Sequence, residues 1–389
     1  MATIRDVARI SGVSSATVSN VLNSRSESVS TDTRERVLAA VRKLHYRPTP
    51  LEKSQKSILT RNLALVCADL SGSPIKLNKY FGLIFDGVLE AAAFQTWSVT
   101  VFVERMWSDT GDAVRRSYDG RCDGVIMLAP SPNSELALNL VERGVPIVSV
   151  GTTFRRAGIS SVDIDNEQAS SDLTRHLAHL GHSRIAYYGP GWNVASSAER
   201  STGYRNTMKE LGLAQQSRIY LTPTPEGAED SGDQPRDLAE FREVPHGAEA
   251  FFRRAFESPE ESPTAIICWN EATARQVVTA LQSHGLRVPG EVSVVGFDDT
   301  QHSTSAQPYL TTMRQPLHEI GMRAVDLLIS RIIDPSLPDA RVRFKAEIVA
   351  RESTGPRSRQ NSHPCHLSRS HRVSSQTFPT NGGNSLNAS

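Results

Sequence analysis

The sequence lacks long apolar stretches. No run of 18 or more apolar residues occurs, which argues against a membrane-spanning helix and a membrane partner. The first 30 residues mix charged and polar side chains, where a secretory signal would need an apolar core. We therefore expect a cytoplasmic protein. Its 389 residues, 38% of them hydrophobic, are enough for two to three domains with full cores.

Cysteine is scarce and scattered. The four cysteines, Cys67, Cys122, Cys268 and Cys365, form no Cys-x-x-C pair and have no His-rich partner spacing. Such a pattern indicates neither a disulfide framework nor a zinc site. We expect the first three to be small buried apolar residues.

Motifs of the common enzyme classes are missing too. The sequence contains no G-x-S-x-G, no phosphate-cradling glycine loop, no H-E-x-x-H and no cluster of metal ligands. The adjacent acids Asp298 and Asp299 have no positioned nucleophile beside them. We expect neither an enzyme nor a bound cofactor or metal.

The formal net charge of +1 hides an uneven distribution. Residues 1 to 61 hold eleven Lys and Arg against five acids, a charge of +6, and residues 356 to 389 hold four Arg and no acid. The segment between them therefore carries −9. A basic end on an acidic body indicates a part that binds a polyanion.

Three short helices are predicted at the basic end. Thr3 and Asp6 have the spacing of a capping box, and the first helix should end at Gly12. Ser14 can cap a second helix and Ser30 a third. The short connection at residues 12 and 13 predicts a sharp crossing of the first two helices. The apolar positions of the first helix, Ile4, Val7 and Ala8, fall on one face. The second helix carries Ala16, Val18, Val21 and Leu22, and the third carries Val37, Leu38, Val41 and Leu44.

The outward face of the second helix carries short side chains, which allow a helix to enter a DNA major groove closely. They are Ser15, Ala16, Thr17, Ser19 and Asn20. On its own, a three-helix pattern with a basic excess fits a DNA-binding domain or a solvated bundle.

From residue 62 onward, short apolar runs alternate with amphipathic stretches. This alternation predicts an α/β fold with doubly wound sheets. The expected strands are 63–68, 99–104, 124–128, 147–150, 185–188, 265–268 and 292–297. The expected helices are 80–95, 134–143, 167–180, 200–211, 271–284 and 316–332.

Polar residues follow several of these strands, where ligands bind in open α/β sheets. Asp298 ends one strand, Asn270 follows another, and Arg200 is expected to open a helix after the loop at 189–192. A carboxylate at such a position is also often structural, and we favour that interpretation for Asp69, Asp163 and Asp299. Trp192 and Trp269 lie beside these positions and fit either stacking on a sugar or the core.

Three segments near the N-terminus resemble the LacI/GalR family of bacterial repressors. They are T-I-R-D-V-A-R-I-S-G-V-S-S-A-T-V-S-N-V-L-N (residues 3–23), V-S-T-D-T-R-E-R-V (29–37) and L-H-Y-R-P (44–48). The resemblance continues through the body. It implies a homodimeric transcription regulator with an α-helical helix-turn-helix headpiece and a periplasmic-binding-protein-like core of two doubly wound lobes.

The resemblance also implies roles for individual residues. Ser15, Ala16 and Asn20 match the base-reading positions, with Asn20 the strongest candidate because an Asn pairs with adenine N6 and N7. The positions that steady the headpiece on DNA are matched by Thr3, Ser14, Thr17, Ser19, Asn23, Ser30 and, in the L-H-Y-R-P segment, Tyr46. Arg200, Asn270 and Asp298 match effector-binding positions. Tyr80 and Phe81 match an aromatic pair that flanks the ligand, although they fit the lobe core equally well.

The segment after Pro48 departs from the family pattern. Gln55 stands where the family places a Leu that wedges into the minor groove, and such wedges are apolar. Three interpretations are open. Gln55 can hydrogen-bond in the groove, or Leu51 or Ile58 can supply the apolar wedge in a shifted register. Alternatively, residues 49 to 61 form a flexible linker that becomes ordered only on DNA.

Two further segments have their own interpretations. Residues 221–245 are acidic and rich in Pro and Gly, which predicts a surface loop, with a lid over the effector as an alternative. Residues 356–389 predict a disordered, inert tail, with nonspecific DNA affinity from its four Arg as an alternative. The tail lacks the leucine heptads that make some family members tetramers, so we expect a dimer.

These observations give one domain map. Residues 1–48 form the DNA-binding headpiece, 49–61 the hinge, 62–355 the effector-binding and dimerisation core, and 356–389 the tail. The N-terminal lobe takes 62–163 and 316–344, and the C-terminal lobe takes 164–315 and 345–355.

The expected function is a repressor that binds operator DNA on the bacterial nucleoid. Its effector is a sugar, a sugar phosphate or a nucleobase, with a sugar preferred. A solute-binding protein that delivers sugar to a transporter is the rival from another class. The basic headpiece and the missing signal argue against it.

Overall fold

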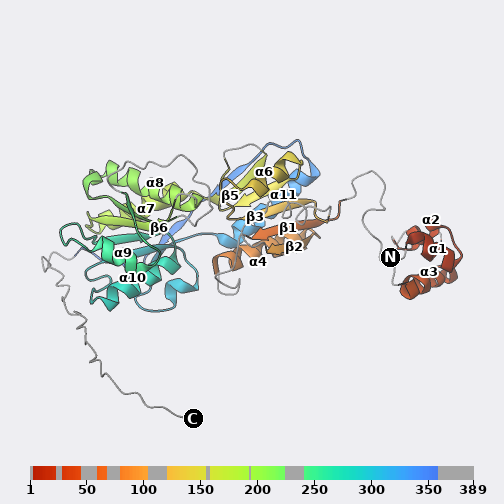
Figure 1. The fold of residues 1–389 in the computed structure, drawn as a ribbon, viewed down its shortest axis with the longest axis horizontal. Coiled ribbons are helices and arrows are strands. Elements are labelled where there is room, and N and C mark those ends of the chain that lie inside the picture. The colour runs from red at the N-terminus through yellow and green to blue at the C-terminus, as the bar shows by residue number, and fades with distance from the viewer. Residues whose placement is uncertain are drawn as a thin grey trace, which may run out of the picture.

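The computed structural model describes residues 3–22, 29–44, 59–67, 79–103, 121–154, 158–191, 194–223 and 241–357. Helices α1 (Ile4–Ser11), α2 (Ser15–Leu22) and α3 (Thr31–Leu44) pack on one another and form the headpiece (Figure 1). The small headpiece core contains Val7, Ala8, Val18, Val21, Val37 and Ala40. The predicted three-helix arrangement is therefore confirmed.

The ends of these helices follow the predicted local chemistry. The Asp6 amide donates to Thr3 Oγ1 at 3.3 Å and the Thr3 amide to Asp6 Oδ2 at 3.0 Å, which completes the capping box. Gly12 ends α1 with a φ of +70°, a left-handed conformation that glycine adopts without strain. Ser14 and Ser30 accept hydrogen bonds from the amides of Thr17 and Thr33 and cap α2 and α3.

The strands of the remaining described chain form two sheets, which helices cover. The six-stranded N sheet is entirely parallel in the order β12 (Arg341–Phe344), β5 (Ile159–Ile164), β4 (Ile147–Val150), β3 (Gly124–Leu128), β1 (Asn62–Cys67), β2 (Ser98–Val103). Helices α4 (Lys79–Phe94) and α11 (Leu317–Ile333) contribute to the apolar core on one face, and α6 (Glu135–Glu142) to the core on the other.

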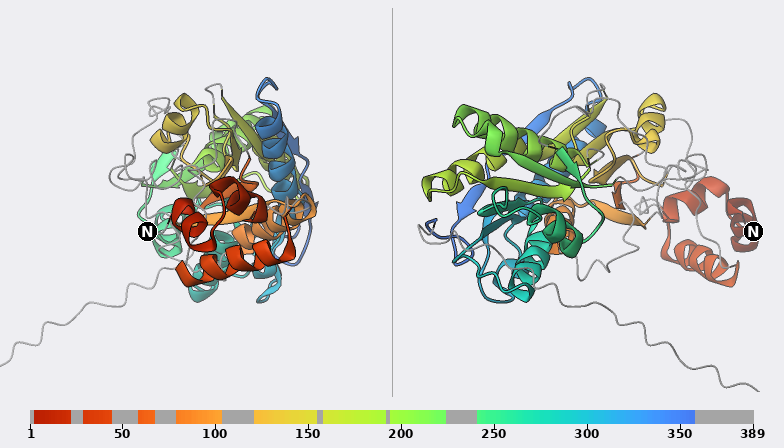
Figure 2. Two further views of the ribbon diagram at one scale, coloured as in Figure 1. Left: turned by 90° about the vertical axis from the view of Figure 1, so that its right-hand side faces the viewer. Right: turned by 60° about the vertical axis from the view of Figure 1, so that its left-hand side comes forward.

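The seven-stranded C sheet has the order β13 (Glu347–Val349), β11 (Thr311–Arg314), β10 (Ser293–Asp298), β9 (Ala265–Cys268), β6 (Ile185–Pro190), β7 (Arg218–Thr222), β8 (Phe241–Glu243). Only β13 is antiparallel among these described strands. Helices α7 (Asn166–His179) and α8 (Ala195–Glu210) lie on one face, and α9 (Ala248–Ala255) and α10 (Glu271–Ser283) on the other (Figures 1 and 2). Two short 3-10 turns, η3 (Ala214–Gln216) and η4 (Gln301–Thr304), complete this lobe. The predicted doubly wound architecture is confirmed.

The chain crosses between the two sheets at three places. It leaves the N sheet after β5, returns after β11 and leaves again after β12. These crossings run side by side, because Ile164 pairs with Phe344 in the N sheet and Arg314 pairs with Glu347 in the C sheet.

Some predicted boundaries were wrong. Helix α8 begins at Ala195, five residues before the predicted start at Arg200. The surface loop predicted at 221–245 is also wrong at both ends, because Leu221 and Thr222 belong to β7 and Phe241 to Glu243 form β8. Its acidic middle, residues 224–240, and the tail from residue 358 lie outside the described residues.

Glycines allow helix backbones to touch in both lobes. A Cβ on Gly203 of α8 would lie 2.1 Å from the Glu167 carbonyl oxygen of α7. A Cβ on Gly87 of α4 would lie 2.0 Å from the His318 carbonyl oxygen of α11. No side chain fits into either contact, so these glycines set how closely the paired helices approach.

The described part of the chain also bears on the cysteines and on membrane-spanning helices. Cys67, Cys122 and Cys268 are buried free thiols. No helix in the described ranges is both long and apolar enough to cross a membrane.

Candidate functional sites: a headpiece helix and a polar cluster between the sheets

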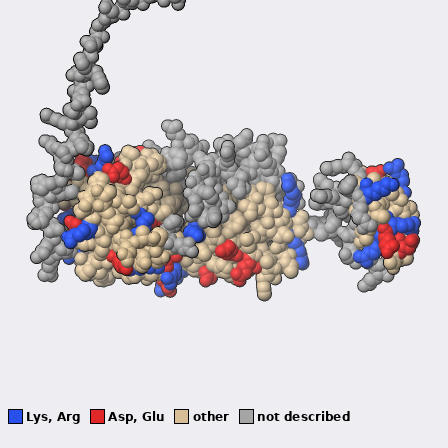
Figure 3. Space-filling view, turned by 90° about the horizontal axis from the view of Figure 1, so that it is seen from below, with Lys and Arg blue, Asp and Glu red and all other residues tan. Residues whose placement is uncertain are grey.

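The outer face of α2 presents short side chains, as the sequence predicted. Ala16 and Asn20 are exposed and lie one turn apart, while Ser15 and Ser19 are half-buried. Val18 and Val21 hold the opposite face against the headpiece core. Lys and Arg side chains gather on the bundle, together with a smaller acidic group (Figure 3). This surface can approach DNA without obstruction by long side chains.

The hydroxyl residues around this surface hold the helix ends. Ser14 Oγ and Thr17 Oγ1 share a hydrogen bond of 2.9 Å, and Thr3 Oγ1 donates to Asp6 Oδ2 at 2.8 Å. Their predicted role on phosphates stays a prediction. The other DNA-binding candidates, Asn23, Tyr46 and Gln55, lie outside the described residues.

A second group of polar side chains meets where the two sheets adjoin. We call it the interlobe cluster. It consists of Tyr80, Asp163, Asn166, Glu199, Arg200, Asp298 and Gln315. Its members come from α4 and β5 on one side, from α7, α8 and β10 on the other, and from the crossing after β11.

Arg200 lies at the centre of this cluster and is only 4% exposed. It is the sixth residue of α8, so it does not open the helix as predicted. Its Nε donates to Asn166 Oδ1 at 2.8 Å, and a terminal nitrogen donates to the Trp269 carbonyl oxygen. The guanidinium carbon lies 4.0 Å from the centre of the Phe297 ring, a stacked cation–π contact.

Asp298 ends β10 beside Arg200. It has a φ of +108°, a strained conformation for a residue with a side chain. Its Oδ1 accepts a hydrogen bond of 2.7 Å from Gln315 Nε2. Burial raises the pKa of Asp298 to about 7, although the charge of Arg200 opposes the shift. The structure therefore places Arg200 and Asp298 together, as the sequence predicted.

Asp163 and Glu199 form a second acidic part of the cluster. Asn166 Nδ2 donates to Asp163 Oδ2 at 3.0 Å and to Glu199 Oε2 at 3.1 Å. Burial and the neighbouring Glu199 raise the pKa of Asp163 to about 7, and burial raises that of Glu199. Asp163, which we had favoured as structural, thus belongs to the candidate site.

The two aromatic candidates, Tyr80 and Phe81, have different surroundings in the structure. Burial and the charges of Asp163 and Asp298 raise the pKa of the Tyr80 hydroxyl, which places Tyr80 within the interlobe cluster. Phe81 packs edge-on against Tyr80, with the ring centres 5.3 Å apart, and both rings rest against the apolar core.

Asn270 has a structural role, and its effector-binding role stays a prediction. Its Oδ1 accepts a hydrogen bond of 2.8 Å from the Thr273 amide and caps α10. The cap occupies the carbonyl oxygen, which leaves the amide nitrogen as the group to donate to a ligand. Trp269, beside it, is half-buried against the core and donates from Nε1 to Ser196 Oγ at 3.1 Å.

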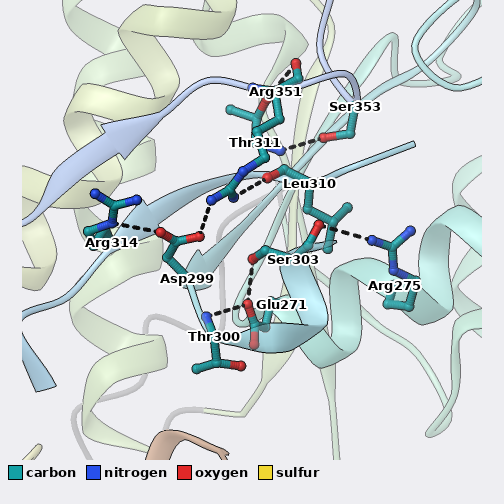
Figure 4. Close-up of polar contacts among 10 residues, drawn as sticks. All are labelled: Glu271, Arg275, Asp299, Thr300, Ser303, Leu310, Thr311, Arg314, Arg351 and Ser353. Atoms are coloured by element: carbon teal, nitrogen blue, oxygen red, sulfur yellow. Dashed lines mark hydrogen bonds and ion pairs between the residues drawn. The ribbon is translucent and has the colours of Figure 1, made fainter. Parts of the chain in front are cut away.

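Asp299 is structural, as favoured from the sequence (Figure 4). Its carboxylate bridges Arg314 Nε at 2.7 Å and a terminal nitrogen of Arg351 at 2.5 Å. Glu271 holds the next part of the loop by accepting from the Thr300 amide and the Ser303 hydroxyl. These bonds hold the loop that follows β10. Asp69 and Trp192 lie outside the described residues.

Sequence reasoning missed three members of the cluster: Asn166, Glu199 and Gln315. Gln315 follows the end of β11, and Asn166 follows Asp165, which caps α7. Polar residues at strand ends and helix starts are a usable signal for both. Glu199 gave no such signal, because it lies within α8.

The raised pKa of Asp163 predicts a pH dependence of stability. An acid whose pKa is higher in the folded than in the unfolded state favours folding at low pH, and this contribution is lost as pH rises through about 7. From pH 4 to pH 7, the free energy of unfolding of Asp163→Asn should therefore rise by a few kcal/mol relative to the wild type. Chemical denaturation at each pH measures it. The exposed Asp86, changed to Asn, is the control for loss of one charge, and parallel curves for Asp163→Asn and the wild type would contradict the prediction.

Comparisons with known proteins agree with this division into headpiece and core. Residues 3–49 match the family described as bacterial regulatory proteins, lacI family, and residues 174–354 match the periplasmic binding protein-like domain. The chain is 28% identical to the transcriptional repressor PurR of Vibrio campbellii, over 91% of this chain and 98% of the relative. It is also 28% identical to the regulator GalR of Escherichia coli, over 93% and 98%.

Solved structures show the same fold. The chain is 25% identical to the transcriptional regulator CelR in its cellobiose complex, with a TM-score of 0.63 over 91% of this chain and 100% of that one. The lac repressor dimer bound to operator and the anti-inducer ONPF is 24% identical, with a TM-score of 0.66 over 91% and 99%.

Proposed function

This chain belongs to the LacI family of bacterial regulatory proteins, and from that premise we propose that it is a homodimeric repressor whose operator affinity is set by a sugar bound in the interlobe cluster. DNA binding and control by a ligand-binding core follow from the family. One observation supports the proposal most strongly. The same chain has a helix, α2, whose exposed face carries short side chains, and a buried polar cluster to which both lobes contribute. Neither a solute-binding protein nor an enzyme needs both features.

The cluster suits a polyhydroxylated ligand. Carboxylates at Asp163, Glu199 and Asp298 accept hydrogen bonds from hydroxyl groups, and the half-buried Trp269 lies nearby. The relative CelR is described in complex with cellobiose, whereas PurR and GalR carry no ligand in their names. An effector that binds one lobe arrangement better than another changes operator affinity, and DNA must change effector affinity by the same factor.

Exposed apolar side chains on the N-terminal lobe support a dimer. Leu83, Leu89 and Phe94 of α4 are exposed, Phe94 by 90%, and Val101 is exposed on β2 at the sheet edge. Apolar surface gathered on one helix and an adjoining edge strand is typical of a protein–protein interface. We propose that this surface pairs two chains, which places two headpieces on one operator.

Selection of a random duplex library on the full chain tests the proposed function. Two headpieces should enrich a palindrome, and the affinity for it should fall steeply with salt because phosphate contacts release counterions. Failure to enrich any sequence would contradict the proposal. The centre of the palindrome will also show whether Gln55 is compatible with a kinked central step.

Asn20→Ala should relax the preference at one position in each half-site. Asn20 is exposed, and an Asn side chain can pair with an adenine edge, so its loss should cost about 1–3 kcal/mol of discrimination there. Repeating the selection with the variant measures this, and the other positions of the site serve as the internal control. A uniform loss at all positions would assign Asn20 to general affinity instead.

A further inference from the structure

Two carboxylates from opposite lobes are held close together in the interlobe cluster. Asp163 lies in β5 of the N sheet and Glu199 in α8 of the C-terminal lobe. Both accept hydrogen bonds from the same nitrogen, Asn166 Nδ2, at 3.0 and 3.1 Å. Because that nitrogen carries two hydrogens, it bonds both acids and holds them side by side between the lobes.

Arg200, the arginine of the cluster, lowers the pKa of both acids through its charge, but it forms no ion pair with either of them. The Arg200 guanidinium is directed to Asn166 Oδ1 and the Trp269 carbonyl oxygen and stacks on Phe297. Arg343 lies near Glu199, but its ion pair, at 3.6 Å, is with Asp165. Within the described ranges, no Lys or Arg forms an ion pair with Asp163, Glu199 or Asp298. Among the described residues of the cluster, three acids therefore share one guanidinium, which is directed to other partners.

A buried oxygen of Gln315 that lacks a hydrogen-bond partner also favours a ligand that carries donors. Gln315 is only 5% exposed, and its Nε2 is used by Asp298 Oδ1. Its Oε1 is buried in the same cluster and has no hydrogen-bond partner. A buried acceptor of this kind is costly unless a donor reaches it. The described part of the cluster thus offers carboxylate oxygens and one amide oxygen that a ligand with donors can satisfy.

We propose that the effector is a hydroxylated ligand that brings a protonated amine between Asp163 and Glu199, and that Glu199 is the residue that selects for its charge. The inference rests on the proposed function, since it names the class of ligand for the same cluster. An ammonium group supplies three donors and one positive charge to the paired carboxylates. Phosphorylated and carboxylated ligands would place a third negative charge there and are excluded.

The test measures binding to the full chain with compounds matched except for charge. Hexose, pentose and disaccharide scaffolds each supply a neutral sugar, the corresponding amino sugar and the phosphate, starting with glucose, glucosamine and glucose 6-phosphate. Thermal shift identifies responders and calorimetry gives their affinities. We expect the amines to bind at least tenfold more tightly than their neutral parents. No response among the amines, or equal or tighter binding of a neutral sugar or a phosphate, overturns the inference.

Glu199→Gln separates charge selection from shape. Glutamine keeps the length of the side chain and an oxygen that accepts from Asn166, so the fold should persist. The affinity for the amine should fall about tenfold, as expected for loss of a charged hydrogen-bond partner, whereas the affinity for the neutral parent should fall less, because the amide oxygen of glutamine still accepts from a hydroxyl group. Glu243→Gln, an exposed change of the same kind on the edge strand β8, is the matched control. An unchanged amine affinity in Glu199→Gln, or an equal loss in the control, overturns the role of Glu199.

This test fails separately from that of the proposed function. Calorimetry needs no DNA. Amine binding without an enriched operator would therefore overturn only the proposed repressor function. An enriched operator without amine binding would overturn only the ligand class.

Discussion

Gly203→Ala is expected to lower the free energy of unfolding by about 3 kcal/mol, the upper end of what overpacking usually costs. The added methyl would lie 2.1 Å from the Glu167 carbonyl oxygen and 2.9 Å from its Cα. Both atoms belong to backbone, which cannot turn aside as a side chain would, so α8 must move away from α7. Chemical denaturation of the full chain measures the loss.

The same displacement should reach the interlobe cluster. Arg200 precedes Gly203 by three residues on α8, and its bond to Asn166 Oδ1 joins α8 to the first turn of α7. The Gly203→Ala variant should therefore bind the effector more weakly as well as unfold more easily.

Gly82→Ala is the matched control for this change. Gly82 also lies inside a helix, but a Cβ there meets nothing within 4 Å. Alanine should leave stability unchanged or raise it by up to about 1 kcal/mol, because it favours the helix. Equal losses in the two variants would show that the close approach of α7 and α8 is not what requires glycine.

Asp298→Asn is expected to abolish the response to effector while leaving operator affinity intact. Asparagine keeps the shape of the side chain and an oxygen for Gln315 Nε2, but removes the carboxylate beside Arg200. The lost charge-assisted hydrogen bonds to the ligand should reduce effector affinity by a factor of about 10 to 100. Titration of the selected operator with and without the ligand found by calorimetry measures both quantities.

The neighbouring Asp299 provides the control. Asp299→Asn removes the ion pairs with Arg314 and Arg351 and should lower stability, yet it changes no group of the interlobe cluster. A folded Asp299→Asn protein should therefore still respond to effector. Arg200→Ala should lose the response like Asp298→Asn, and loss of folding in both cluster variants would refute their assignment to a binding site.

Local chemistry made most of the fold predictable. The Thr3–Asp6 capping box and Gly12 are read from short-range sequence, because every partner lies within a few residues. Apolar runs also located most strands. The strand β5 was missed since Ser160, Ser161 and Asp163 interrupt its apolar pattern, although all of its residues are buried.

The candidate site was predictable only in part. Arg200 and Asp298 came from motifs, but the motif did not show that Asn270 caps a helix. Glu199 and Asn166 are 33 residues apart in the chain, and their contact exists only because α8 packs on α7. No periodicity in a single sequence encodes such a pair.

The three adjacent crossings between the sheets limit how the lobes can move. A single connection would let two bodies rotate about any axis, whereas three strands joined by the pairs Ile164–Phe344 and Arg314–Glu347 resist twisting and shear. The easy motion that remains is a bend across the crossings. The lobes can therefore respond to a bound ligand mainly through this one angle.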